Sequence, residues 1–146
     1  MRLSAINAVH KKNTRNTLNM EQMYKLHDLG LAYIKERNDH IDCEYGVEEL
    51  LQILPACIVV DKKMYILQVY KTAFDIVAVH YKNPKDVEDN TFYAKGCDDV
   101  DNGWNAFQSG HLVDVLYDCL LWVNENYPSE LEEFKEKLQH YIEINY

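Results

Sequence analysis

The sequence lacks the long apolar segments that place a protein in a membrane. No apolar run in the chain approaches the ~20 residues that a membrane-spanning helix needs. The first residues also lack the apolar core of a secretory signal. We therefore expect a cytoplasmic protein that does not interact with a membrane.

The cysteines do not form a metal or redox motif. Cys43, Cys57, Cys97 and Cys119 include no C-x-x-C pair, which excludes zinc-ribbon and thioredoxin-type motifs. Each cysteine lies in or beside an apolar segment, the usual place for a reduced, buried thiol. This pattern also favours the cytoplasm, and nothing in the sequence predicts a cofactor.

Glycine and proline are scarce, with five and three residues, whereas 47% of the residues are hydrophobic. This composition predicts a folded globular chain rather than a disordered one. The length of 146 residues suits a single domain that buries its own core. We expect residues 1–18 to form a basic, flexible arm and residues 19–146 to form one domain.

Basic residues are outnumbered, with 15 Lys and Arg against 24 Asp and Glu and a net charge of −9. The arm carries Arg2, Lys11, Lys12 and Arg15 and no acid, so the rest of the chain is still more acidic. An acidic body is repelled by the phosphates of nucleic acids. We therefore expect the folded domain not to bind nucleic acid directly.

Four segments have the apolar spacing of helices: residues 19–37, 47–54, 102–126 and 129–145. Asn19 is a predicted N-cap of the first helix, and Gly30 within that helix indicates a close packing contact. Pro55 is predicted to end the second helix, because the residue before a proline is pushed out of the helical region. Glu133 and Lys137 have the i, i+4 spacing of an ion pair.

The middle of the chain supports two interpretations. Residues 66–80 keep a helical apolar spacing, yet the same segment is dense in Val, Ile and Tyr. We favour strands, because β-branched density and short turns agree. The predicted strands are 57–60, 64–70, 74–81 and 91–96, with a tight turn at Asp61, Lys62 and Lys63 between the first two. Two helices, about four strands and two helices (ααββββαα) predict an α+β fold with an antiparallel sheet.

The acidic stretch GCDDVDNG between the last predicted strand and the third helix is a candidate metal site. A standard calcium loop fails by register, because Val100 and Ser109 stand where two oxygen ligands are needed. A looser Mg²⁺ or Ca²⁺ site from Asp98, Asp99 and Asp101 stays open. The alternative is that these residues only cap the helix and favour its positive end.

His111 is the candidate catalytic residue of the third helix, with Asp114 one turn later to orient its imidazole. A histidine that only packs at the edge of the apolar stripe is the competing interpretation. The predicted strands offer a different kind of site. Four tyrosines could face a partner if helices cover one side of the sheet: Tyr65, Tyr70, Tyr81 and Tyr93.

These observations lead to hypotheses from different functional classes. The first is a small acidic, non-catalytic protein that binds another protein through an acidic, tyrosine-bearing surface. In size and composition it resembles the small accessory proteins of bacteria and their phages, which include inhibitors and modulators. The second is a metal-assisted hydrolase or small-ligand binder that uses Asp98, Asp99, Asp101 and His111. A third is a self-associating structural protein, such as a homodimer.

Overall fold

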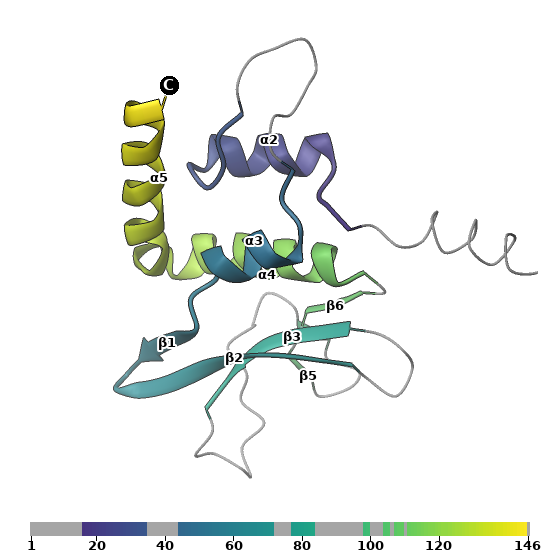
Figure 1. Cartoon of the computed structure of the whole chain (residues 1–146). Coiled ribbons are helices and arrows are strands. Elements are labelled where there is room, and N and C mark those ends of the chain that lie inside the picture. Colours follow the sequence, from purple (N-terminus) through teal and green to yellow (C-terminus); the bar gives the residue numbers. More distant parts are fainter. Residues whose placement is uncertain are drawn as a thin grey trace, which may run out of the picture.

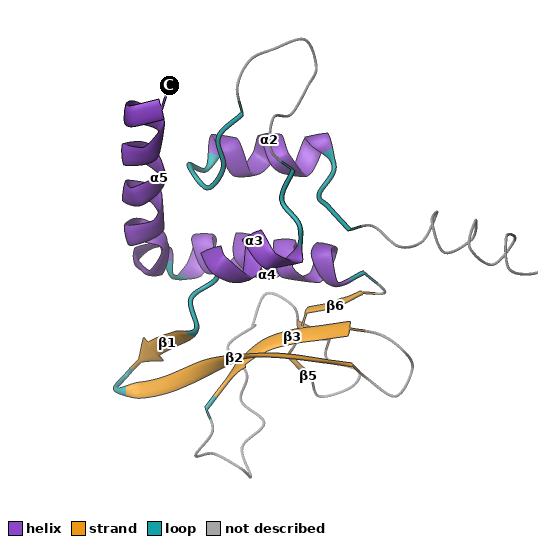
Figure 2. Ribbon diagram, viewed as in Figure 1, coloured by secondary structure: helices purple, strands orange, loops and turns teal. Residues whose placement is uncertain are grey.

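The structure is a computed structural model of the chain. It describes residues 16–34, 44–71, 77–83, 98–99, 104–105, 107–109 and 111–145. Within these ranges the protein has the predicted α+β class, with helices gathered on one face of an antiparallel sheet (Figures 1 and 2). The helices are α2 (Met20–Asp28), α3 (Val47–Ile53), α4 (Leu112–Asn126), η3 (Pro128–Leu131, a 3-10 helix) and α5 (Glu132–Asn145). The strands are β1 (Cys57–Val60), β2 (Lys63–Lys71), β3 (Val77–Lys82), β4 (Asp98–Asp99), β5 (Trp104–Asn105) and β6 (Phe107–Ser109).

The main sheet consists of three consecutive antiparallel strands that are extended by the short β6, in the order β1–β2–β3–β6. The register places Ile58 opposite Tyr65 and Leu67 opposite Tyr81 on the face that meets the helices. The strand interpretation is therefore correct for the residues of 64–81 that the structure describes.

The turn between β1 and β2 is the predicted tight turn. Val60 pairs with Lys63, so the turn has only two central residues, Asp61 and Lys62. Their φ angles of 51° and 66° are both positive. This is typical of a type I′ turn, whose twist matches that of the flanking strands.

The fourth strand of the sheet is not where the sequence predicts it. Residues 91–96 lie outside the described residues, and the strand that pairs with β3 is β6. Both β5 and β6 lie inside 102–126, which was predicted as helix, so that prediction is wrong at Trp104–Asn105 and Phe107–Ser109. The backbone of Phe107–Ser109 pairs with Val77–Val79, and periodicity within one segment cannot reveal a partner strand so distant in sequence.

The first helix begins as predicted but ends early. The Gln22 N–H donates to Asn19 Oδ1 at 2.8 Å, and the Asn19 N–H donates to Gln22 Oε1 at 3.0 Å, which is a capping box. The helix ends at Asp28 rather than continuing to residue 37. Gly30 causes this end, because its φ of +77° belongs to the left-handed C-terminal cap that glycine favours.

Hydrogen bonds at this cap turn the chain back along the helix. The Leu31 N–H donates to Leu26 O at 2.8 Å and the Gly30 N–H to His27 O at 3.0 Å. This pair of bonds is the Schellman motif, and the buried Leu26 and Leu31 supply its apolar contact. Gly30 therefore serves this turn through its positive φ angle, and not through the close packing contact that was predicted.

The residues just before α2 are part of the fold. Of the predicted arm, residues 1–15 lie outside the described residues. Thr17 forms an isolated antiparallel bridge with Gly46, and the buried Leu18 donates its N–H to Tyr45 O at 2.8 Å. Residues 17 and 18 are therefore held by the chain at Tyr45 and Gly46.

The core lies where α3 and α4 meet the inner face of the sheet (Figure 1). α3 ends as predicted, because Leu54 before Pro55 is extended. The Pro55 carbonyl then accepts a hydrogen bond from Tyr81 Oη at 2.7 Å. The ring of Tyr81 stacks on Trp122 of α4, with ring centroids 6.4 Å apart, so one side chain joins the sheet to both helices.

α5 is the least enclosed helix of the described chain. It begins at Glu132, after η3, rather than at residue 129, and none of its residues is buried. The predicted ion pair of Glu133 and Lys137 is present at 3.0 Å on its exposed face. Figure 1 shows α5 rising from the end of α4 past the end of α2.

None of the helices in the described ranges combines the length and the apolar character that crossing a membrane requires.

Candidate functional site

The structure only partly covers the predicted metal site. Asp98 and Asp99 form β4 and pair with Asn105 and Trp104 of β5, whereas Asp101 lies outside the described residues. No group of three or more His, Cys, Asp or Glu in the described ranges is placed to hold a metal ion. Because the aspartates are not fully described, the site that they were predicted to form stays a prediction.

His111 occupies a different position from the predicted one. It is the N-cap residue of α4 rather than a residue two turns into the helix, and its carbonyl accepts the N–H groups of Asp114 and Val115. Asp114 accepts a hydrogen bond from Gln22 Nε2 at 2.9 Å. This bond joins α2 to α4, which gives Asp114 a structural role.

The predicted tyrosine surface is divided between the two faces of the sheet. Tyr65 and Tyr81 point toward the helices and are buried. Tyr70 is half-buried on the outer face, and Tyr93 lies outside the described residues. Tyr65 and Tyr81 are therefore core residues, and they do not offer their rings to a partner in this fold.

A partly buried polar cluster lies on the outer face of β2 and β3. His80 Nε2 is 2.9 Å from Gln68 Oε1, and the rings of His80 and Tyr70 lie 4.9 Å apart. Burial lowers the pKa of His80 to about 4, with a further contribution from Lys82, and burial raises the pKa of Tyr70 to about 12. Both rings are therefore neutral at pH 7 and buried or half-buried, which suits packing better than proton transfer.

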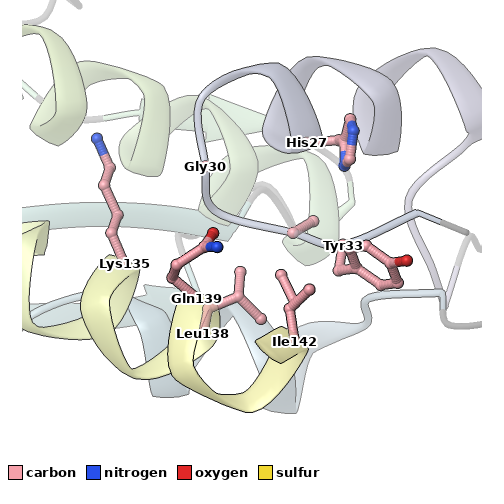
Figure 3. A pocket seen from close by; sticks show the side chains of 8 residues that line it. His27, Gly30, Tyr33, Lys135, Leu138, Gln139 and Ile142 are labelled. Carbon is pink, nitrogen blue, oxygen red and sulfur yellow. The ribbon is translucent and has the colours of Figure 1, made fainter. Parts of the chain in front are cut away.

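A groove of about 330 Å³ lies between the end of α2 and α5 (Figure 3). The turn at Gly30 builds one wall, because it reverses the chain so that 31–34 run beside α5. Tyr45 Oη donates to Leu31 O at 3.1 Å and fixes this segment from the core side. The lining residues are His27, Gly30, Ala32, Tyr33, Lys135, Leu138, Gln139 and Ile142.

Two polar side chains of the groove, His27 and Lys135, form hydrogen bonds with neighbouring residues. The Ile34 N–H donates to His27 Nδ1 at 3.2 Å, which fixes the orientation of the ring. Lys135 Nζ donates to Asn124 Oδ1 at 3.0 Å, and Figure 3 shows this ammonium directed away from Leu138 and Ile142. The interior of the groove is therefore mainly apolar, although the amide of Gln139 also reaches it.

Exposed apolar side chains continue from the groove onto both helices. Met20 and Tyr24 are exposed and share a face of α2 with His27 by their spacing. Tyr141 is 54% exposed on α5, next to Ile142. The two helices that flank the groove, α2 and α5, carry more acids than lysines: Glu21, Asp28, Glu132, Glu133, Glu136 and Glu143 against Lys25, Lys135 and Lys137. The groove is thus an apolar, tyrosine-bearing depression in an acidic helical layer.

A second apolar surface lies at the other end of the molecule, on the outer face of the β1–β2 hairpin. Val59, Met64 and Ile66 are 58%, 50% and 37% exposed. Val59 pairs directly with Met64, and Ile66 follows Met64 on the same face. Apolar groups on a solvent-facing side of a sheet indicate a surface for contact.

Comparisons of the chain with protein-family models, with curated proteins and with solved structures find no match.

The groove and its tyrosines were not found from the sequence. Tyr24, Tyr33 and Tyr141 lie in helical or irregular segments, whereas the predicted tyrosine surface consisted of strand residues. One signal was present. The apolar spacing of the C-terminal helix includes Tyr141, which the structure leaves exposed.

Proposed function

We propose that the protein is a small non-catalytic interaction protein that binds a segment of another protein in the groove between α2 and α5. The observation that carries this proposal is the apolar depression of about 330 Å³, flanked by exposed Met20, Tyr24 and Tyr141. Tyrosine is favoured in protein interfaces because it combines a large apolar area with a polar tip. Through such binding the protein would act as an inhibitor or modulator of its partner.

The chemistry of the groove restricts the partner. Its volume and lining suit one or two apolar anchor side chains, which are the usual centre of an interface. The surrounding helices carry an excess of carboxylates, so basic residues around that anchor would be attracted. We therefore propose a partner segment that combines an apolar anchor with Lys or Arg.

Two matched variants of α5 test the proposal. Ile142→Lys places a charge in the lining of the groove. Ile144→Lys changes a residue that is 68% exposed and outside the lining, about 200° away around the helix. Tagged wild-type protein and both variants should be compared as baits in lysate of the source cells, with captured proteins quantified by mass spectrometry.

We expect at least one partner at near-stoichiometric amounts that Ile142→Lys loses and Ile144→Lys keeps. Its recovery should fall when the salt concentration rises from about 0.05 M to 0.5 M, because salt screens charge pairs at the rim. Thermal melts must show that both variants are folded. If every captured protein is bound equally by the two variants, the groove is not the binding site.

A further inference from the structure

Within the described part of the chain, β1 is an edge strand of the main sheet. β1 is the first strand in the order β1–β2–β3–β6, and among the described residues no strand pairs with its other side. The Leu67 N–H donates to Ala56 O at 3.0 Å. Hydrogen-bonded pairs alternate along an antiparallel ladder, so Ile58 and Val60 also bond to β2.

The same alternation directs the backbone groups of Cys57 and Val59 away from β2. Each of these residues offers one N–H and one C=O at the free edge, spaced as in an antiparallel ladder. An added strand could take up these groups, as in proteins that recognise extended peptides at a sheet edge. Figure 1 shows β1 at the margin of the sheet.

The outer face beside this edge provides apolar contacts. Val59 stands on β1 itself, and Met64 and Ile66 stand on β2 directly behind it. All three side chains are exposed, so a strand added to β1 would cover part of a surface that already lies open to solvent. Apolar side chains of that strand on the same face would pack against Val59.

The charge of the sheet is opposite to the charge of the helices. Among the described side chains of the β1–β2 hairpin and β3, the charged ones are Lys62, Lys63 and Lys82 and one acid, Asp61. Lys62 lies in the hairpin turn next to β1, and Lys82 lies opposite Ile66 on the outer face. A negatively charged segment would therefore be attracted to this end of an otherwise acidic molecule.

We propose that the free edge of β1 binds an extended, acidic segment of a partner protein by strand addition. The backbone of Cys57 and Val59 supplies the hydrogen bonds, Val59, Met64 and Ile66 supply the apolar contacts, and the lysines select for acidic residues. This site is separate from the groove between α2 and α5, and it does not depend on the function proposed for that groove.

A synthetic peptide with alternating residues, acetyl-EVEVEVE-amide, is a suitable probe. Titration into ¹⁵N-labelled full-length protein should shift the amide signals of Cys57 and Val59 and of the neighbouring hairpin. The basic analogue acetyl-KVKVKVK-amide should bind at least about tenfold more weakly, because its positive charges are repelled by the lysines of the protein. A peptide N-methylated at the residues that face β1 should not bind, because it lacks the donors for the ladder.

A variant of β1 tests the same contact from the protein side. Val59→Pro removes an N–H that points to the free edge, so no bond between β1 and β2 is lost. We expect the probe to bind about five- to tenfold more weakly to this variant, the effect of one lost hydrogen bond. Leu51→Ser, which changes an exposed apolar residue of α3, should leave binding unchanged.

Any one of three results would overturn the proposal. One is that the acidic and basic peptides bind equally well. Another is that N-methylation has no effect, a result that does not require Val59→Pro to fold. The third is that the edge is already occupied by a second copy of the chain, which sedimentation would show as a dimer that Val59→Pro dissociates. None of these results bears on the groove, which Ile142→Lys tests separately.

Discussion

At the scale of single residues, His80 links burial to the pH dependence of stability. The folded chain holds the pKa of His80 at about 4, mainly because burial disfavours the charged ring, and Lys82 adds to this. In the unfolded chain its pKa is about 6.5. The contribution of neutral His80 is therefore complete above about pH 6.5 and is lost as the pH falls toward 4.

We predict that acid weakens the fold through this residue. Between about pH 6.5 and pH 4 the free energy of unfolding should fall by about 2–3 kcal/mol on account of His80. The variant His80→Gln, which can still hydrogen-bond to Gln68, should lack this component. Urea unfolding of both proteins at several pH values gives the difference. Equal pH dependence of the two proteins would show that His80 does not carry the effect.

At the scale of elements, α4 and α5 differ in how firmly they are held. Most residues of α4 are buried against α3 and the sheet, whereas none of α5 is buried. A helix is stabilised mainly by the packing of its apolar face. The half-buried Phe134, Leu138 and Ile142 give α5 a smaller share of this packing, and two of them line the groove.

We predict that α5 opens more readily than α4. Amide hydrogen exchange should be at least about tenfold faster in the second half of α5 than in the centre of α4, because local opening costs less free energy where few apolar contacts break. Exchange measured by NMR on the full chain provides the comparison, with α4 as the internal control. Similar protection in both helices would mean that α5 unfolds only with the whole molecule.

At the scale of the whole molecule, charge is separated between the two layers. The helices hold most of the acids of the described chain, and the sheet carries more lysines than acids. Two of these acids, Glu125 and Glu143, lie in the last turns of α4 and α5, which contain no basic residue. A carboxylate there opposes the negative end of the helix dipole.

We predict that salt stabilises the fold. Raising KCl from about 0.02 M to 0.3 M should increase the free energy of unfolding by about 1 kcal/mol, because it screens repulsion among the carboxylates. The double variant Glu125→Gln and Glu143→Gln should be more stable at low salt and respond less to KCl. Urea unfolding at the two salt concentrations measures both effects. A fold that weakens with salt would instead be dominated by favourable ion pairs.

Sequence patterns predicted features that depend on neighbours along the chain. The cap at Asn19, the end of α3 before Pro55, the turn at Asp61 and Lys62 and the pair of Glu133 and Lys137 are all local. The predictions that failed depend on distant segments. β6 forms because Phe107–Ser109 pairs with β3. α4 therefore begins at Leu112 and not at residue 102 as predicted.

The candidate sites also depend on contacts between distant segments, which the sequence patterns did not reveal. Tyr65 and Tyr81 were predicted to face a partner because their strands were recognised, but the face that the helices cover was not known. The groove combines His27 and Tyr33 with Leu138 and Ile142, and no spacing along the chain relates the two groups. Strand alternation could place Val59, Met64 and Ile66 on one face, but only the assembled sheet shows that this face is the exposed one.

The sequence alone determined the α+β class, the acidic character and the local signals that start and stop helices and turns, because these follow from composition and from residues a few positions apart. Only the tertiary structure decided which sheet face is covered, where the free edge of β1 lies and that α2 and α5 enclose a groove. Each of these depends on packing between segments that are distant in sequence, where apolar burial rather than local preference determines the outcome.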